Sequence, residues 1–255
     1  MCLILLAVDP EPGTRLLLAA NRDEEHARPS APADRWQGSP IFGGRDLRAG
    51  GTWLGIGPRG RLAALTNVRH PGARRTGASR GALPVRFLES DATPEAFARE
   101  LAPRLASYPS FNLILFDPRE GTFSWTDEGG PPGRIGRGLH GLANARLDVA
   151  WPKVSRGLGQ VEQALGLDGE ARTAHLFAAL ADDQVALDDD LPDTGVPREV
   201  ERLLSPAFIR GPVYGTRSST VVAIHDDGSV LFEERSFLPS GEPGAVVRQA
   251  LSPTQ

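Results

Sequence analysis

Four times along this chain, two apolar runs of strand length are separated only by a short turn-forming segment. The paired runs are 2–8 with 15–21, 52–57 with 61–67, 111–117 with 121–126, and 216–225 with 229–237. The segments between them are rich in Gly, Pro and Asp, which favour turns. The 29 Gly and 22 Pro among 255 residues fit a chain with many turns. Because so short a connection favours antiparallel pairing, the sequence predicts antiparallel sheets built from hairpins.

Helical patterns lie between the hairpins. Thr93 is the predicted N-cap of a helix with Pro94 at its first position, and Pro103 should kink or shorten that helix. Apolar residues at helical spacing predict two more helices, over 154–165 and around 176–180. Hairpins alternating with helices predict an α+β protein with helices outside antiparallel sheets. We find no internal repeat and expect one domain over residues 1–255.

Composition excludes several classes of protein. The chain has 28 basic and 32 acidic residues, a net charge of −4, so it lacks the basic footprint of nucleic-acid binding. It has no run of about 18 apolar residues, so no integral membrane segment is expected. The apolar stretch 3–8 is too short for a secretory signal, which favours a cytoplasmic protein. The single cysteine excludes an internal disulfide.

Arginines cluster in one acid-free segment. Between Asp46 and Glu89 there is no acidic residue and there are eight arginines: Arg48, Arg59, Arg61, Arg69, Arg74, Arg75, Arg80 and Arg86. Such a segment is commonly a solvated basic face. Alternatively, it forms a rim that attracts an anionic small molecule.

Two familiar kinds of site are not indicated. Residues 55–60 have the spacing Gly-x-Gly-x-x-Gly, but a dinucleotide site needs a helix after this motif, and here Pro58 marks a turn before a second strand. The five histidines are scattered, and none has metal-ligand spacing with another. The sequence therefore predicts neither a metal nor another cofactor.

Cys2 is the candidate for chemistry. A lone cysteine in an apolar strand is ordinarily a small buried residue. Removal of Met1 would instead leave a thiol and an α-amine on the same residue. The amine then acts as general base for the thiol, as in enzymes with an N-terminal threonine. Reference pKa values of about 8.5 and about 7.7–8 make this proton transfer uphill by less than roughly 1 kcal/mol.

Polar residues at strand ends are candidates for the rest of such a site. Arg22 and Asp23 lie at the end of the second strand of the first hairpin, which makes them predicted neighbours of residue 2. Asn67 and Asn144 carry side-chain amides of the kind that donates to an oxyanion. Arg217 begins the strand 216–225. Each of these residues also has an ordinary explanation in charged segments or turn chemistry.

At these residues the chain resembles the NRDE family, which is also named for transport and Golgi organisation. The shared motifs run in order across nearly the whole chain: Met1-Cys2, Asn21-Arg22-Asp23-Glu24, Gly50-Gly51-Thr52-Trp53-Leu54-Gly55, Ser79-Arg80-Gly81, Trp151-Pro152-Lys153 and Tyr214-Gly215-Thr216-Arg217. One departure is Val68, where the family pattern favours an aromatic residue. The resemblance implies an N-terminal nucleophile hydrolase-like fold, a four-layer αββα sandwich.

A more distant similarity of layout, to bile-salt and penicillin acylases, implies roles for the candidate residues. Cys2 would be the nucleophile and, through its amine, the base; Asp23 would hold the amine and Arg22 would steady the thiolate. Asn67 and Asn144 would bind the oxyanion, and Arg217 would support the pocket.

Two functions follow from these expectations. The first is hydrolysis of a non-peptide C–N amide bond in a small molecule through an acyl-cysteine intermediate. The second is non-catalytic binding or transfer of haem or of an acyl-CoA or lipid-type anionic ligand, which the arginine-rich segment would hold. A fold alone does not choose between them.

Overall fold

The strands form two antiparallel sheets in a computed structural model that describes residues 2–126 and 132–252. One sheet has the order β10-β1-β2-β11-β12-β13, with bounds Gly138–Leu142, Cys2–Glu11, Thr14–Glu25, Tyr214–His225, Val230–Phe237 and Pro243–Leu251. The other has the order β3-β4-β5-β6-β7-β8-β9, with bounds Ser30–Arg35, Phe42–Asp46, Leu54–Ile56, Leu62–Asn67, Phe111–Asp117, Gly121–Thr126 and Gly133–Arg134. Every pairing within both sheets is antiparallel.

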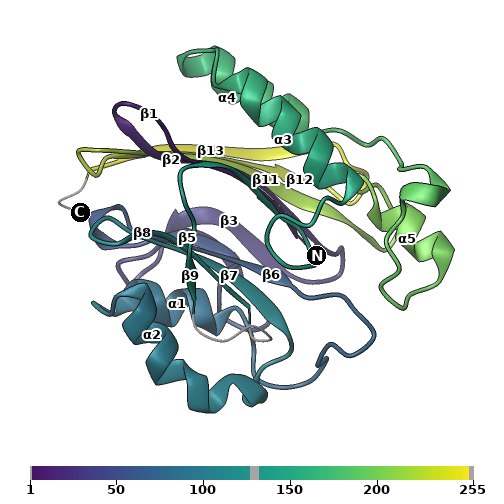
Figure 1. The fold of residues 1–255 in the computed structure, drawn as a ribbon, viewed down its shortest axis with the longest axis horizontal. Coiled ribbons are helices and arrows are strands. Elements are labelled where there is room, and N and C mark those ends of the chain that lie inside the picture. The colour runs from purple at the N-terminus through teal and green to yellow at the C-terminus, as the bar shows by residue number, and fades with distance from the viewer. Residues whose placement is uncertain (1, 127–131, 253–255) are drawn as a thin grey trace.

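Helices cover the outer faces of both sheets, so the molecule has four layers. Helices α3 (Pro152–Ala164) and α4 (Gly169–Leu180) contact β1, β2, β10 and β11, while α1 (Ala82–Glu89) and α2 (Pro94–Leu101) contact β5, β6 and β7. A fifth helix, α5 (Arg198–Leu204), follows α4. Figure 1 shows the two sheets stacked between these helices. The expected α+β sandwich with αββα layers is confirmed.

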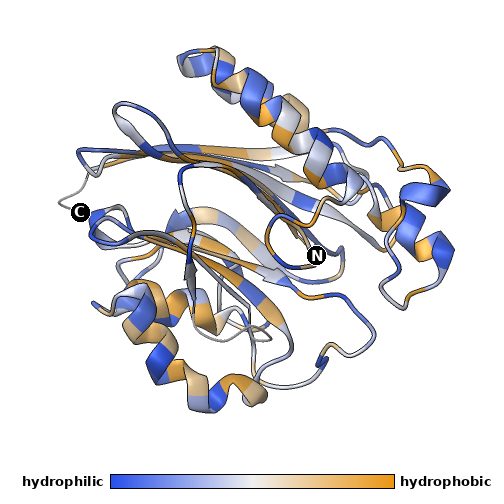
Figure 2. Cartoon of the chain, in the orientation of Figure 1, coloured by the Kyte–Doolittle hydropathy of each residue, from blue (hydrophilic) through white to orange (hydrophobic). Residues whose placement is uncertain are grey.

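Strand β1 is buried on both faces, which explains its continuous apolar sequence. Ile4, Leu6 and Val8 point into the core between the sheets, whereas the alternate residues Leu3 and Leu5 pack in the core under α3 and α4. A third core lies under α1 and α2. Figure 2 shows hydrophobic and hydrophilic bands alternating along α2, α3 and α4, as helices that cover a sheet require.

The predicted hairpins and helices agree with the structure in type and place. The strands expected over 111–117 and 121–126 have the bounds of β7 and β8. The Thr93 hydroxyl accepts a hydrogen bond from the backbone N–H of Ala96 at 3.3 Å, and α2 gives way to a 3-10 turn, Ala102–Ser107, that contains Pro103. Strands β3, β4, β9, β10 and β13 and helices α1 and α5 were not predicted.

The register of the first hairpin positions the candidate site. Cys2 pairs with Arg22 across β1 and β2, and β2 continues through Asp23 to Glu25 instead of ending at residue 21. Strand β11 pairs with the other edge of β2, with Thr216 opposite Asp23 and Ser218 opposite Arg22. Arg217 is therefore the extra residue of a β-bulge, which changes its direction relative to simple alternation.

Candidate functional site

Cys2 lies at a cavity where the two sheets meet. Its side chain is partly exposed and not in a disulfide. The cavity has a volume of about 350 Å³, and its wall includes Cys2, Arg22 and Asp23 from one sheet and Leu65 and Asn67 from β6 in the other. Four of the six predicted site residues, Cys2, Arg22, Asp23 and Asn67, thus line one cavity.

Arg22 is buried within the wall of this cavity. Its guanidinium lies 4.4 Å from the centroid of the Trp53 ring, and its Nη2 is 3.8 Å from carboxylate oxygens of both Glu24 and Asp46. Its Nη1 has no hydrogen-bond partner among the residues that the structure describes. Arg22 therefore holds a positive charge beside Cys2 with donor capacity to spare.

Asp23 is buried and fixed by strand β11. Its Oδ1 accepts a hydrogen bond from the Thr216 hydroxyl at 2.7 Å, and its backbone carbonyl accepts one from the Tyr214 hydroxyl at 2.7 Å. Burial raises the pKa of Asp23, while the charges of Lys153 and Arg22 and the Thr216 hydrogen bond act in the opposite direction. The carboxyl group is thus held in place next to residue 2.

Asn67 and Asn144 play different structural parts. Asn67 ends β6 and lines the Cys2 cavity, whereas Asn144 is completely buried and is not part of the cavity wall. The Asn144 Nδ2 donates to the backbone carbonyl of Asn67 at 2.9 Å. Asn144 therefore positions the end of β6, and its second amide hydrogen is the one left for another acceptor.

Arg217 holds the loop after β2 and does not line the Cys2 cavity. Its Nη1 donates to the backbone carbonyls of Glu25, His26 and Arg28 at 3.0, 3.1 and 3.3 Å. These carbonyls belong to the segment that carries Arg28 back towards Asp46. Arg217 therefore contacts the backbone of residues 25–28 and does not reach the Cys2 cavity itself.

The other walls come from residues whose roles the sequence did not indicate. Trp53, Thr52 and Gly81 line the cavity, and Gly44 lies so close under Trp53 that a Cβ would meet the indole ring at 2.2 Å. Lys153, at the start of α3, is buried and donates to the Leu204 carbonyl at 2.8 Å. Thr52, Trp53, Gly81 and Lys153 lie within motifs shared with the NRDE family, but sequence patterns indicated no role for them in the site.

Charges around the Cys2 cavity are balanced. Arg28 Nε lies 2.6 Å from Asp46 Oδ2, and both residues line the cavity with Glu24. Although burial acts in the opposite direction, the Arg28 hydrogen bond and backbone N–H groups lower the pKa of Asp46. The wall therefore carries the cations Arg22, Arg28 and Arg80 and the acidic residues Asp23, Glu24 and Asp46.

The surroundings of Cys2 do not stabilise its thiolate form overall. Burial raises its pKa, and the negative charge of Asp23 adds to this effect, while Arg22 opposes it. Burial also lowers the pKa of Lys153 to about 8, with the Asp23 charge acting in the opposite direction. A reaction at Cys2 thus needs a base close to the sulfur.

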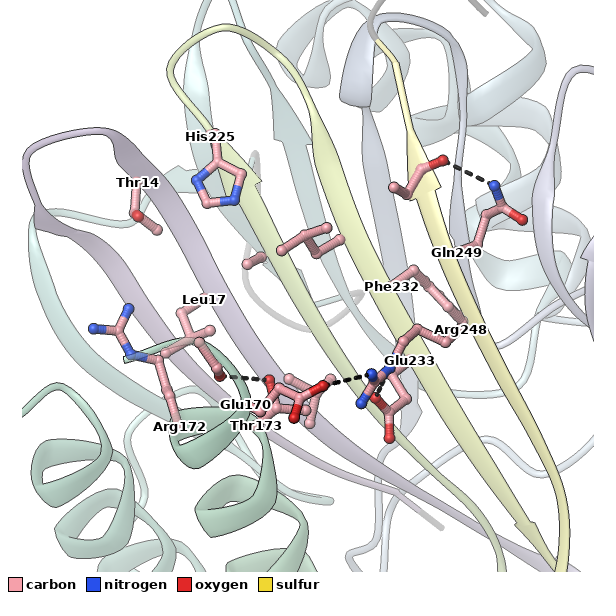
Figure 3. A pocket seen from close by; sticks show the side chains of 15 residues that line it. Thr14, Leu17, Glu170, Arg172, Thr173, His225, Phe232, Glu233, Arg248 and Gln249 are labelled. Carbon is pink, nitrogen blue, oxygen red and sulfur yellow. Dashed lines mark hydrogen bonds and ion pairs between the residues drawn. The ribbon is translucent and has the colours of Figure 1, made fainter. Parts of the chain in front are cut away.

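A cavity larger than the Cys2 cavity lies elsewhere and has a different character. It has a volume of about 540 Å³ and lies on the outer face of the first sheet, between α4 and β11–β13. Figure 3 shows Arg248 in this cavity between Glu170 and Glu233, at 3.1 and 2.7 Å. Its wall holds no cysteine, and Arg172 and Arg248 have carboxylate partners. We therefore place the candidate active site at Cys2.

These observations define a class of protein: a four-layer α+β sandwich with a cysteine, an arginine and an aspartate on adjacent strands at a cavity between the sheets. Comparison with known proteins gives the family. The profile of the family described as transport and Golgi organisation 2 matches residues 1–239. The chain belongs to this family, as the shared motifs predicted.

Curated relatives match over nearly their whole length. The chain is 37% identical to the transport and Golgi organization protein 2 homolog of Bos taurus, with 94% of each chain covered. It is 35% identical to the Homo sapiens homolog, with 93% of this chain and 94% of that one covered. It is 26% identical to transport and Golgi organization protein 2 of Drosophila melanogaster, with 95% of each covered.

Two solved structures are also similar to the chain. One is a C2A mutant of a conjugated bile acid hydrolase from Clostridium perfringens, 9% identical with a TM-score of 0.48, covering 100% of this chain and 98% of that one. The other is a protein from Silicibacter pomeroyi, 14% identical with a TM-score of 0.35, covering 98% of this chain and 78% of that one.

Within the described ranges, no cluster of three or more His, Cys, Asp or Glu residues has the arrangement of a metal site. Nor does any helix in that part of the chain combine the length and apolar character needed to cross a membrane.

Proposed function

We propose that the protein is an N-terminal cysteine hydrolase that cleaves a non-peptide C–N amide bond in a small molecule. The observation that supports this most directly is the grouping of Cys2, Arg22, Asp23 and Asn67 around one cavity of about 350 Å³. The volume lies at the lower end of ordinary ligand pockets. We further propose that residues 1–255 act as one domain in the cytoplasm.

In this proposal Met1 is removed and the α-amine of Cys2 is the general base. The amine takes the thiol proton, and Arg22 stabilises the thiolate that forms. Asp23 holds the resulting ammonium group in position, with its own orientation fixed by Thr216. A base within the same residue compensates for the burial that raises the pKa of the thiol.

The reaction then has two steps. The thiolate attacks the amide carbonyl carbon, a tetrahedral intermediate forms, and the C–N bond breaks as the ammonium group gives its proton to the leaving amine. The resulting thioester is attacked by water, which loses a proton to the amine, and the acid leaves with regeneration of the thiol. The Asn67 side chain is the proposed oxyanion donor, a contact worth about 2.7–4 kcal/mol of barrier when well aimed. Asn144 acts by positioning Asn67.

The alternative is non-catalytic binding of haem or of an acyl-CoA or lipid-type anionic ligand. The raised pKa of Cys2 favours it, because a protonated thiol without a base is unreactive. Titration with haem and with an acyl-CoA distinguishes the two functions. Equal binding by the wild type and Cys2→Ala, with no amide turnover, is the result expected of a binding protein.

The hydrolase is tested with purified protein and a panel of N-acyl amides. We expect intact-mass spectra without Met1, accumulation of an acyl adduct on Cys2, and loss of turnover by at least about a thousandfold in Cys2→Ala. Cys2→Ser retains the amine and a weaker nucleophile and should keep a residual rate. Retention of Met1 by active protein, or turnover by Cys2→Ala at the wild-type rate, contradicts the mechanism.

A further inference from the structure

Directly beside the Cys2 cavity lies a smaller cavity, distinct from the one between α4 and β11–β13. It has a volume of about 280 Å³, and Asn67 and Arg80 line both cavities. Arg80 is partly buried, and its Nη1 donates to the Ser110 carbonyl at 2.9 Å. Burial lowers the pKa of Arg80, and the negative charge of an ionised Cys2 acts in the opposite direction. The two cavities therefore form adjoining parts of one recess.

This smaller cavity is strongly basic. Four arginines line it, Arg69, Arg74, Arg75 and Arg80, and its wall holds no Asp or Glu. Glu201 pairs with Arg69 at 3.0 Å from outside the wall and offsets one charge. Within the described ranges, neither Arg75 nor Arg80 lies within 4.0 Å of a carboxylate oxygen. This cavity, which we call the basic pocket, differs from the balanced Cys2 cavity.

Backbone carbonyls and an aromatic ring help to position these arginines. Arg74 Nε donates to the Tyr108 carbonyl at 3.1 Å, and Arg80 uses the Ser110 carbonyl. Arg69 lies over the Trp151 ring at 5.0 Å. A hydrogen bond to a neutral carbonyl does not remove the charge of a guanidinium, so Arg80 keeps its charge and further donors for an oxyanion.

Seven of the eight arginines in the acid-free segment 47–88 thus form two groups. Arg59, Arg61 and Arg86 meet carboxylates from other parts of the chain, Asp91 at 2.6 Å, Asp117 at 3.1 Å and Glu100 at 2.7 Å. These pairs explain their presence as structural. In the described part of the chain, Arg75 and Arg80 of the basic pocket have no such carboxylate partner.

We propose that the basic pocket binds an acidic group, carboxylate or phosphate, on the same molecule whose amide carbonyl reaches Cys2. This inference rests on the proposed function, since it specifies the substrate of that site. The substrate is then an amide with an acidic group on one side of the scissile bond. Arg80, which faces both cavities, contacts that group closest to the reacting atoms.

The test uses the single cysteine as a reporter. Iodoacetate and iodoacetamide both alkylate a thiolate with loss of iodide, but only iodoacetate is anionic. Their rate ratio reports the preference for an anion at Cys2, independently of the thiolate fraction. We expect the ratio to exceed that of N-acetylcysteine amide. It should fall about two- to sixfold in Arg75→Gln and in Arg80→Gln, because each substitution removes one Coulomb attraction for the anion.

Matched variants isolate the charge of the pocket. Arg80→Lys keeps the charge and should retain the high ratio. Arg59→Gln removes an arginine of the same segment that pairs with Asp91, outside both cavities, and should leave the ratio unchanged. The preference should also fall as NaCl screens the pocket. A wild-type ratio that survives both Arg75→Gln and Arg80→Gln overturns the proposal.

Competing anions and substrates identify the acidic group. At constant ionic strength, acetate or inorganic phosphate should lower the ratio of the wild type, and the anion effective at the lower concentration gives the preferred group. A ratio that neither anion changes overturns binding in the pocket. Because alkylation needs no hydrolysis, this result is separate from the amide panel. If hydrolysis fails while the ratio behaves as expected, the proposed function is wrong and the anion pocket stands.

Discussion

Single side chains at the site show how burial and partners compete. Asp23 has an opposite charge in Arg22 beside it and a hydrogen bond from Thr216, yet burial still raises the pKa of Asp23. The pKa of the Cys2 thiol is raised for the same reason. Desolvation penalises each ionised group separately, whereas their partners are shared. Burial therefore raises both pKa values, and the charge of Arg22 acts against it at each group.

Glu234 on β12 is a buried carboxyl group that links the two sheets. Its Oε1 accepts a hydrogen bond from the backbone N–H of Ala33 on β3 at 2.7 Å. Burial raises its pKa from 4.5 to about 7, against the hydrogen bonds and the Arg22 charge. Since the folded state binds the proton more tightly than the unfolded state, this contribution to stability is complete below pH 4.5 and is lost as the pH rises through about 7.

We predict that Glu234→Gln gains stability relative to the wild type as the pH rises from about 5 to about 8. The difference in free energy of unfolding between the two proteins should shift by about 2.5 kcal/mol in favour of the variant. Urea unfolding at both pH values measures it. Glu242→Gln, the same substitution at an exposed position, is the matched control. An unchanged difference for Glu234→Gln contradicts the buried titration.

At the scale of elements, local patterns predicted the hairpins well and the irregular strands poorly. Strands β7 and β8 have strong apolar runs on either side of a turn, and their bounds agree with prediction. Strand β4 reads Phe-Gly-Gly-Arg-Asp, and β13 has mostly exposed residues. Neither carries an alternating apolar pattern. Pairing with neighbouring strands, more than their own side chains, makes these segments strands.

Helix α3 offers a matched pair of glycines for testing its packing. A Cβ on Gly159 would meet nothing within 4 Å, whereas one on Gly157 would lie 2.7 Å from a methyl carbon of Leu5, which is buried in β1. We predict that Gly159→Ala stabilises the protein by about 0.5–1 kcal/mol through helix propensity. Gly157→Ala should be less stable than Gly159→Ala by about 1–3 kcal/mol, because Leu5 must move.

Thermal and urea unfolding of the two variants check this comparison. Equal stabilisation at both positions would show that α3 does not approach β1 as closely as described. A loss at Gly159 would show instead that the exposed face of the helix has an unseen contact.

At the scale of the whole molecule, the two sheets are joined by side chains from distant parts of the sequence. The rings of Phe42 on β4 and Phe232 on β12 meet edge to face, with centroids 5.1 Å apart and planes at 85°. Both belong to the core between the sheets. The contact thus joins the two sheets, both of which contribute walls to the Cys2 cavity.

We predict that Phe232→Ala lowers the free energy of unfolding by about 3–5 kcal/mol. In a double-mutant cycle, Phe42→Ala and Phe232→Ala should show a coupling energy of about 0.5–1.5 kcal/mol, as an edge-to-face pair gives. Phe97, in the core under α2, is the control, and its substitution should be additive with Phe232→Ala. Additivity of Phe42→Ala and Phe232→Ala would argue against the contact between the sheets.

The sequence by itself determined the α+β class, the first hairpin with Arg22 and Asp23 beside Cys2, and the family, because these depend on short-range patterns and ordered motifs. Only the tertiary structure decided that Thr216 holds Asp23 across 193 positions, that Asn144 supports Asn67, and that Arg217 turns to the backbone. It also divided the arginine segment into paired residues and a basic pocket. Such contacts join residues far apart along the chain, and packing and charge balance in the folded core select them, which no local pattern encodes.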